Sequence, residues 1–413
     1  MPGTAKRGDS VSESAKPLVL DERFVQDAHA VAAELRAASP VRHVFLPGGL
    51  PVWLVTGYEQ ARRAATDPRL SSHRVYDRME RMMLPPGVDS PFSPEVGNSL
   101  LNLDPPDHTR IRKSVALSFT SRSVARLRPR IEATADELLD AAVLAQETAE
   151  DGAFDLITGY AQPLPVRIIA ELLGIPYADR EQFVAWSDTL ASGPDPFAVG
   201  AASAEIADYL GGLIEDKRAA PEDDLISKLA SAEDLSRRDI VSTSVVLLMG
   251  GFETTANLIS SGTLALVRNP AQLDLLRAKP ELLAAAVEEL LRFDTPNNLS
   301  SPRYATADVE LGGVTIPAGE FVMISWLGAN RAGERFSDAD RLDITRRSGG
   351  HLAFGHGLHY CVGAPLARLE GEIAFGRLLS RFADVELAAA PESLRWRASM
   401  AMHGLEELRV RLR

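Results

Sequence analysis

The cysteine loop near the C-terminus holds the residues best suited to chemistry. Cys361 is the only cysteine of the 413-residue chain, and it lies in the segment Phe354-Gly355-His356-Gly357-Leu358-His359-Tyr360-Cys361-Val362-Gly363. The glycines before it permit tight backbone conformations, and a helical pattern begins directly after it. A cysteine at a helix N-terminus faces unpaired N–H groups and the positive end of the helix dipole, which favour the thiolate. A thiolate so placed can bind a metal ion, including iron.

Two other interpretations of this loop are possible. A lone cysteine is most often a small buried hydrophobic residue. A zinc cluster could instead combine Cys361 with His351, His356 and His359. However, these four residues lie in one short loop, without the Cys-x-x-Cys or His-x-x-x-His pairs that zinc sites usually contain.

A second candidate site lies within a long helical pattern over residues 236–267. Its centre reads Gly250-Gly251-Phe252-Glu253-Thr254-Thr255, and each glycine in a helix interior costs about 1 kcal/mol relative to alanine. Missing side chains make room for a ligand, and an opened hydrogen-bond ladder lets water or dioxygen approach the Thr254 hydroxyl. Alternatively, Glu253 and Thr254 merely cap or bend the helix.

Two further pairs of charged residues have helical spacing. Glu289 and Arg292 are three residues apart and share a helix face, although such a pair on a soluble helix is usually a weak surface ion pair. His108 and Arg112 are four residues apart and also point the same way. Alone, each of these residues could be an ordinary solvated charge.

Together these motifs resemble those of the bacterial cytochrome P450 enzymes. The cysteine loop with Ala364–Glu370 is similar to the family's haem-binding signature, and Gly250–Thr254 to its oxygen-activation motif, although Gly250 stands where alanine is usual. Glu289 and Arg292 match its Glu-x-x-Arg motif. The motifs cover about residues 100–370 in the expected order.

The resemblance implies a role for each of these residues. Cys361 would bind the iron of haem b, and Thr254 and Glu253 would be catalytic, through a hydrogen bond to the dioxygen being activated and through proton relay. Glu289, Arg292 and Arg341 would be structural and hold the Cys361 loop against the core. The residues implied to bind the cofactor are His108, Arg112, Arg303, His359 and Cys361. The acidic groups of haem need such cationic donors.

The substrate is predicted from positions in the family. The residues implied to face it are Val246, Met249, Asn298, Leu299 and Met400, together with the 72–100 loop. Met79, Met82 and Met83 in that loop could adapt to bulky ligands or simply fill gaps in the core. This mostly apolar lining favours a neutral, fairly large molecule such as a polyketide, terpenoid or peptide-derived metabolite.

The implied activity is that of a monooxygenase of secondary-metabolite biosynthesis, which would hydroxylate, epoxidise or oxidatively couple its substrate. A haem protein that senses or carries a ligand without turnover is the alternative, but such a protein has no need of Glu253 and Thr254. Electrons would come from an external ferredoxin and its NAD(P)H-dependent reductase, because no flavin or iron–sulfur segment is attached. We expect the ferredoxin to dock beside Cys361 at Arg110, Lys113 and Arg368.

The composition limits the cellular context. A net charge of -13 argues against nucleic-acid binding and against adhesion to an anionic membrane. One cysteine fits a reducing cytoplasm. No unbroken apolar stretch approaches the roughly 18 residues of a membrane span, and the first sixteen residues do not form a signal peptide. We therefore expect a cytoplasmic monomer with a disordered tail over residues 1–16.

The elements that position these residues are predicted to be mostly helices. Helical periodicity covers residues 58–67, 106–119, 123–147, 160–173, 177–191, 200–217, 224–230, 236–268, 271–278, 280–293 and 364–382. Strands are expected at 52–56, in a hairpin over 309–316 turned by Gly312-Gly313, at 321–324 continuing that hairpin's sheet, and around 405–412. The prediction is one mainly α domain over residues 17–413 with small peripheral β-sheets. The resemblance implies a triangular helical prism that encloses the haem.

Overall fold

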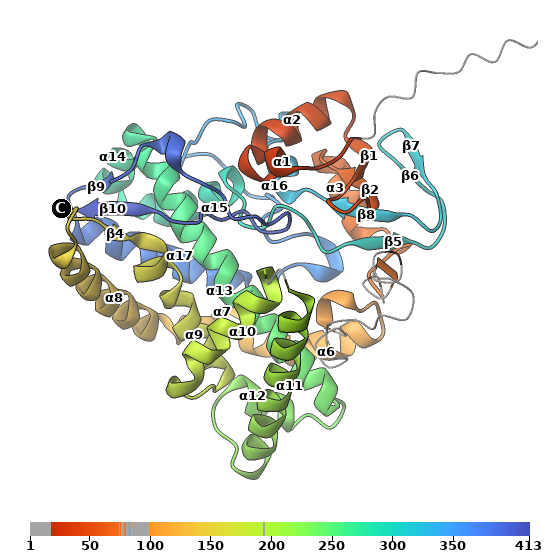
Figure 1. Ribbon diagram of the computed structural model, residues 1–413, viewed down its shortest axis with the longest axis horizontal. Coiled ribbons are helices and arrows are strands. Elements are labelled where there is room, and N and C mark those ends of the chain that lie inside the picture. The colour runs from red at the N-terminus through yellow and green to blue at the C-terminus, as the bar shows by residue number, and fades with distance from the viewer. Residues whose placement is uncertain (1–17, 74, 76–77, 80–81, 83–98, 193–194) are drawn as a thin grey trace, which may run out of the picture.

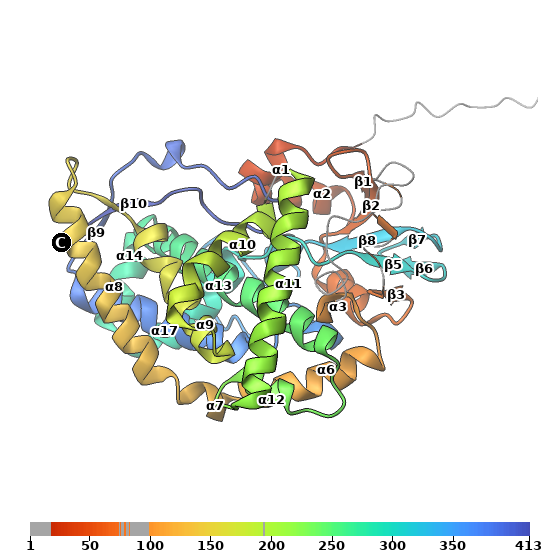
Figure 2. The ribbon, with the colours of Figure 1, turned by 60° about the horizontal axis from the view of Figure 1, so that its bottom comes forward.

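The computed structural model describes residues 18–73, 75, 78–79, 82, 99–192 and 195–413. The predicted N-terminal tail, residues 1–16, lies outside the described residues, as do Met83 and most of the 72–100 loop. The molecule has a roughly triangular outline in Figure 1, with helices over most of its area. In both ribbon views one β-sheet lies at one end and a second at the opposite end (Figures 1 and 2).

The α-helices form the bulk of the described chain. They are α1 (Glu22–Gln26), α2 (Ala28–Ala38), α3 (Tyr58–Thr66), α6 (Asp107–Ala116), α7 (Ser121–Ala125), α8 (Arg128–Thr148), α9 (Pro163–Leu173), α10 (Arg180–Ser192), α11 (Pro196–Ala219), α12 (Leu225–Ala230), α13 (Arg237–Val267), α14 (Pro270–Ala278), α15 (Leu283–Phe293), α16 (Trp326–Asn330) and α17 (Ala364–Arg381). Short 3₁₀ or π turns occupy η1 (Leu100–Asn102), η2 (Leu117–Phe119), η3 (Ile157–Ala161), η4 (Tyr177–Asp179), η5 (Pro280–Leu282), η6 (Gly357–His359) and η7 (Pro391–Ser393).

Helix α13 crosses the centre of the molecule. Ser236 and Asp239 begin it with a capping box, in which each side chain accepts a hydrogen bond from the other's backbone N–H. Most of its residues are buried, because α9, α11, α15 and α17 pack around it. Its apolar residues, with those of α9, contribute to the largest hydrophobic core. A helix that is apolar on all sides is stable only in such an interior.

The strands of the described residues make three sheets. They are β1 (Val41–Phe45), β2 (Pro51–Val55), β3 (Leu70–Ser71), β4 (Phe154–Asp155), β5 (Arg303–Ala305), β6 (Val309–Leu311), β7 (Val314–Ile316), β8 (Phe321–Ile324), β9 (Val385–Leu387) and β10 (Arg409–Leu412). The first sheet has the order β1-β2-β8-β5-β3, the second β4-β10-β9, and β6 and β7 form a two-stranded hairpin. All strand pairs are antiparallel except β2 with β8.

The mainly α prediction with small sheets is confirmed, and so is the hairpin, whereas one expectation about its sheet differs from the structure. The predicted hairpin is β6–β7, and Gly312 and Gly313 at its turn have φ of 61° and 84°. The expected continuation of its sheet by residues 321–324 is wrong: β8 pairs with β2 and β5 instead. All four residues of β8 are buried, so this strand fits the interior of a larger sheet and not a peripheral hairpin.

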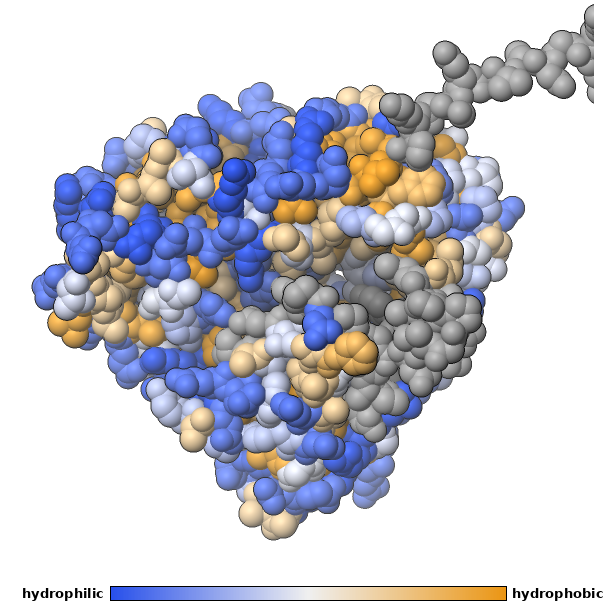
Figure 3. All heavy atoms as spheres, viewed as in Figure 1, coloured by the Kyte–Doolittle hydropathy of each residue, from blue (hydrophilic) through white to orange (hydrophobic). Residues whose placement is uncertain are grey.

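One described helix has the length and composition that could cross a membrane. It is the Phe197–Ala219 part of α11, and half of its most apolar window is buried inside the structure. The face in Figure 3 is mostly hydrophilic, and its hydrophobic colour gathers at the upper right, over α1, α2 and β1.

Candidate active site

The cysteine loop folds back on itself before α17. The Cys361 N–H donates to the Phe354 carbonyl at 2.9 Å, which closes the loop. Gly355 and Gly357 have φ of 70° and 74°, in the left-handed region that glycine adopts without strain. At Gly357 a Cβ would also lie 2.9 Å from the Ala65 carbonyl oxygen of α3. Both glycines are therefore needed to hold Cys361 at the entrance of α17.

The electrostatics of the thiol differ from the sequence expectation. Burial is the largest influence and raises the pKa of Cys361. The Gly363 and Ala364 N–H groups and Arg112 act in the opposite direction, as expected at a helix N-terminus, but they do not outweigh burial. A metal cation bound to the sulfur would reverse that balance, since a coordinating thiol is deprotonated outright. The donor set at this loop thus fits a single thiolate ligand to a metal.

Four cationic or potentially cationic side chains gather beside the loop. His108 and Arg112 come from α6, Arg303 begins β5, and His359 ends η6. The rings of His108 and His359 lie 4.6 Å apart, edge to face. Both ring nitrogens of His108 and Nε2 of His359 are buried without a hydrogen-bond partner among the described residues. Buried polar atoms normally have partners, so this group requires partners that the described residues do not supply.

The pKa values of these groups have a common cause. Burial, followed by Arg112, lowers the pKa of His108 to about 4. Burial, followed by Arg303 and His108, lowers the pKa of His359 to about 3. Burial also lowers the pKa of Arg303 and of Arg112. Anionic groups bound between them would relieve this repulsion and accept their hydrogen bonds. The carboxylates of haem fit this requirement.

The glycine pair of α13 has two separate functions. A Cβ at Gly251 would lie 2.7 Å from Cγ1 of Ile169, so this glycine allows α9 to approach closely. A Cβ at Gly250 would meet nothing within 4 Å. Only Gly250 therefore leaves room beside the helix, whereas the sequence suggested that both glycines do. The Thr254 hydroxyl donates to the Gly250 carbonyl at 3.0 Å, on this open side.

Two carboxylic acids lie near Thr254. Glu253 is 8% exposed, and its Oε1 is 3.1 Å from Nη2 of Arg397 in the C-terminal segment. Glu370 on α17 is fully buried, and burial raises the pKa of Glu370 well above its usual range, with Thr255 opposing only part of that rise. Burial thus favours the neutral form of Glu370, whereas Glu253 has a cationic partner.

The Glu289 network corrects one predicted partner. Arg292 Nε lies 2.7 Å from Glu289 Oε2, and both side chains are fully buried. The second arginine is Arg346, whose Nε is 3.1 Å from Glu289 Oε1. The predicted Arg341 is instead 70% exposed and pairs with Asp343. The prediction of Arg341 was wrong because of a turn in the backbone. The Thr345 N–H donates a hydrogen bond to the Asp343 side chain at 3.0 Å, and after this turn Arg346, not Arg341, points inward.

The neighbouring Glu288 contacts both ends of the cysteine loop. Its carboxylate oxygens are 3.2 Å from His351 Nε2, before Cys361, and 2.6 Å from Arg368 Nε, after it. Burial opposes ionisation, but these two partners outweigh it and lower the pKa of Glu288 to about 2. His351 is therefore a hydrogen-bond partner of Glu288, and among the described residues the histidines of the loop form no metal-binding group with Cys361. This disfavours the zinc alternative.

The predicted substrate-facing residues lie in two different environments. Val246, Met249 and Met400 are partly buried. Asn298 and Leu299 are 2% and 1% exposed, and the Asn298 side chain accepts from the Ser325 hydroxyl at 3.0 Å. Met79 packs against the same core cluster as Leu299 and Met400, whereas Met82 is 59% exposed. The amide oxygen of Asn298 is thus already bonded within the protein.

The predicted docking residues are mostly bonded internally. Arg110 lies 3.0 Å from Asp239 at the start of α13, and Arg368 is paired with Glu288. Lys113 is exposed, and so is Leu117, in the same stretch of chain. Leu358 and Tyr360, each 38% exposed, flank Cys361 in sequence. The exposed surface beside the loop is therefore more apolar, and less cationic, than the sequence suggested.

Sequence reasoning missed three residues of this site. Ser348 donates to Glu289 Oε2 at 2.6 Å, and Arg346 and Arg397 form the ion pairs described above. Arg346 and Ser348 could be noticed only as polar residues shortly before the cysteine loop. Arg397 carries no signal, because its partner Glu253 is 144 positions away in the chain.

Comparisons with known proteins agree with this geometry. The family model that matches is Cytochrome P450, over residues 182–396. Cytochrome P450 107B1 of Saccharopolyspora erythraea is 45% identical over 400 residues, which are 95% of this chain and 97% of that protein. The polyketide biosynthesis cytochrome P450 PksS of Bacillus subtilis is 38% identical, over 95% and 97%. The structure of the tirandamycin C-bound P450 monooxygenase TamI has a TM-score of 0.88 and 45% identity, over 96% of this chain and 100% of that chain.

Proposed function

Because this chain belongs to the cytochrome P450 family and is a P450 monooxygenase, we propose that it oxidises a mostly apolar organic molecule in secondary-metabolite biosynthesis. The enzyme uses haem b and receives electrons from an external redox partner. The haem, when bound, supplies the activation of dioxygen and the oxidation of the substrate. The residues of this chain hold the haem, position the substrate and handle protons.

Cys361 is the proposed ligand of the iron. His108, Arg112, Arg303 and His359 are the proposed donors to the haem carboxylates, and the unpartnered, buried ring nitrogens of His108 and His359 support this assignment. This convergence of orphaned donors beside the cysteine loop is the observation that carries the proposal. Buried cationic donors without an anion would cost several kcal/mol.

Thr254 and Glu253 are the proposed catalytic residues. Thr254 presents its hydroxyl on the side of α13 that Gly250 leaves open, where it can hold a water or a reacting oxygen atom by a hydrogen bond. Glu253 is the adjacent carboxylate, which can accept and return a proton. A carrier or sensor of ligands would require neither group, and this argues against a non-catalytic haem protein.

The proposed substrate is a neutral and fairly large metabolite, for example a polyketide. Support comes from the apolar, partly buried Val246, Met249 and Met400, and Leu299 belongs to the core cluster against which Met400 packs. Asn298 is a further proposed contact. The similar proteins PksS, whose name places it in polyketide biosynthesis, and TamI, whose structure holds tirandamycin C, point in the same direction. Hydroxylation, epoxidation and oxidative coupling are all within reach of this chemistry.

The proposed redox partner is a ferredoxin, and we place the enzyme in the cytoplasm as a monomer. The ferredoxin would dock on the face beside Cys361, with Lys113 as its exposed cation and Leu117 and Leu358 as apolar contacts. Reversing the charge of Lys113 should slow electron transfer from ferredoxin, and unchanged reduction rates would exclude this surface.

The first experiment is an absorption spectrum of the protein reduced with dithionite and exposed to carbon monoxide. Wild-type protein should give the long-wavelength Soret band of thiolate-ligated ferrous haem, and Cys361→Ser should lose it while the fold is retained. Product formation per NAD(P)H with a surrogate ferredoxin and its reductase then separates a monooxygenase from a carrier. Haem binding without any product, across a panel of macrolactones, would favour the carrier.

A further inference from the structure

The C-terminal loop, defined here as residues 394–405, connects the predicted substrate contact to the proton-relay residue. Its two arms are joined by a backbone bond from the Arg397 N–H to the Gly404 carbonyl at 2.9 Å and by a bridge between Trp396 and Leu405. The tip carries Met400. The Asn298 N–H donates to the Ala401 carbonyl beside it at 2.7 Å.

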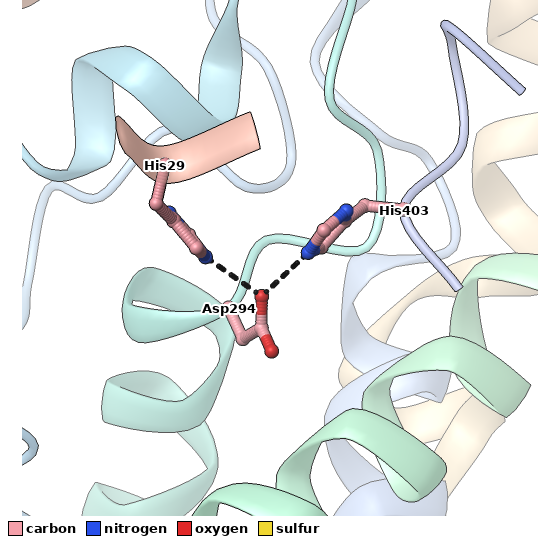
Figure 4. Close-up of side chains that lie close together, drawn as sticks. All are labelled: His29, Asp294 and His403. Carbon is pink, nitrogen blue, oxygen red and sulfur yellow. Dashed lines mark hydrogen bonds and ion pairs between the residues drawn. The ribbon is translucent and has the colours of Figure 1, made fainter. Parts of the chain in front are cut away.

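The loop is anchored on both sides of Arg397. The Gln26 side chain donates to the Trp396 carbonyl at 2.8 Å and accepts from its N–H at 3.1 Å. The Trp396 ring stacks on His403 at 3.7 Å. Figure 4 shows that His403 and His29 both point at Asp294, whose Oδ1 lies 3.0 Å from Nε2 of each. Arg397 therefore projects from a backbone with little freedom to shift.

This His29–Asp294–His403 cluster has the spacing of a metal site, but its surroundings favour an anchor. Arg331 already supplies a cation, with Nη2 3.5 Å from His29 Nε2. Nδ1 of His29 is buried and has no hydrogen-bond partner among the described residues, whereas a metal-binding histidine almost always donates its second ring N–H. Burial, and then Arg331, lower the pKa of His29 to about 4, and the charge of Arg331 interacts favourably with that of Asp294.

Arg397 links two residues on one face of α13. Its Nη2 lies 3.1 Å from Glu253 Oε1 and 2.9 Å from Asn257 Oδ1. These partners are four positions apart, whereas Glu253 and Thr254 are adjacent and point in different directions. A Cβ at Gly404 would lie 2.2 Å from Asn257 Oδ1 and 2.7 Å from Arg397 Nη2. A side chain at position 404 would therefore displace the Asn257 amide and the Arg397 guanidinium.

We propose that Arg397 is a positioning residue for Glu253: it fixes the carboxylate against Asn257 and makes proton relay depend on the placement of the C-terminal loop. The inference rests on the proposed role of Glu253. Arg397 itself exchanges no proton and touches no reacting atom.

The test compares Arg397→Gln and Arg397→Lys with a matched control, Arg395→Gln. Arg395 is exposed and lies two residues away in the same loop, so its substitution removes the same charge without removing the Glu253 partner. The probe is the macrolactone that gives the largest haem spin-state shift in a screen. Product formed per NAD(P)H should fall about fivefold in Arg397→Gln, the size expected for coupling between contacting groups, while KM changes less than twofold. Arg397→Lys should recover most of the yield.

A double-mutant cycle and amide exchange complete the test. In a Glu253→Gln background, Arg397→Gln should cause no further loss of product yield, because its effect passes through that carboxylate. Amide hydrogen exchange of the haem-loaded protein should rise in residues 250–257 and 394–405 for Arg397→Gln and stay unchanged for Arg395→Gln. If Arg397→Gln lowers the yield equally in both backgrounds, or raises exchange without changing the yield, the proposal is overturned. A wild-type protein that binds haem but forms no product would refute the proposed function instead, and the exchange experiment would still report on the contact.

Discussion

The two arginines near Glu289 offer the sharpest prediction, because only one of them contacts it. Arg346 is 14% exposed and pairs with the buried Glu289 carboxylate, and its guanidinium also donates to the carbonyls of Ser337, Asp338 and Arg341. Arg341 is 70% exposed, and its side chain forms a surface pair with Asp343. The change to make is therefore Arg346→Gln, with Arg341→Gln as its control.

The expected magnitude follows from these contacts. Removing Arg346 leaves Glu289 with Arg292 and Ser348, so the buried charge is weakened but not stranded. A charge-assisted hydrogen bond is worth about 1.5–3 kcal/mol, and removing one partner of a buried pair costs about 3–5 kcal/mol. We expect Arg346→Gln to cost about 3 kcal/mol of unfolding free energy, or about a hundredfold in the equilibrium constant. Arg341→Gln should stay within about 0.5 kcal/mol of wild type.

The assay is urea unfolding of the haem-loaded protein, followed by Soret absorbance and far-ultraviolet circular dichroism. Because the Glu289 network holds the segment before Cys361, Arg346→Gln should also lose the thiolate form of the carbon monoxide complex at lower urea than the helices unfold. Equal losses in the two variants, or a larger loss in Arg341→Gln, would refute the assignment of Arg346.

Three other predictions follow from the site. Gly250→Ala should preserve the free energy of unfolding or raise it by up to about 1 kcal/mol, because the new Cβ meets no described atom within 4 Å. Gly251→Ala should lower it by about 1–3 kcal/mol, because the new Cβ overpacks against α9. Thermal unfolding would distinguish the two variants, and equal effects would contradict the two roles. The pKa of Glu288 is lowered to about 2. The ionised carboxylate therefore stabilises the fold at pH values above the pKa of an ordinary glutamate, and this stabilisation is lost as the pH falls toward 2. The difference between wild type and Glu288→Gln should therefore shrink below a pH of about 4, and a difference that grows in acid would be incompatible with the pairing. Lys113→Glu should slow reduction by ferredoxin, more strongly at low ionic strength, while dithionite reduction stays unchanged; stopped-flow absorbance measures both.

The helices and the cysteine loop could be predicted because their signals are local. Periodicity, capping residues and the glycines before Cys361 lie within a few residues of the structure that they specify. The hairpin turn at Gly312 and Gly313 is local in the same sense. The sheet order is not, because β8 pairs with β2 more than 260 positions earlier in the chain.

The candidate site shows the same limit. His108 and His359 were expected from motifs, and the structure brings their rings to 4.6 Å of each other. Arg346 was missed because a side-chain turn at Asp343 decides which arginine points inward. Arg397 was missed because its contact joins α13 to the C-terminal loop. Periodicity identifies the face of a helix, but it does not identify the partner that covers that face.

The two adjacent carboxylates of α15 have a practical consequence for changing the enzyme's substrate range. Glu288 restrains both flanks of the cysteine loop, and Glu289 restrains the segment that precedes it. The residues that form these restraints lie on α15, on α17 and in the segment before Cys361. In contrast, Val246 and Met249 belong to α13, and Met400 belongs to the C-terminal loop. A protein engineer could therefore vary the predicted pocket extensively while the metal-binding loop keeps its geometry.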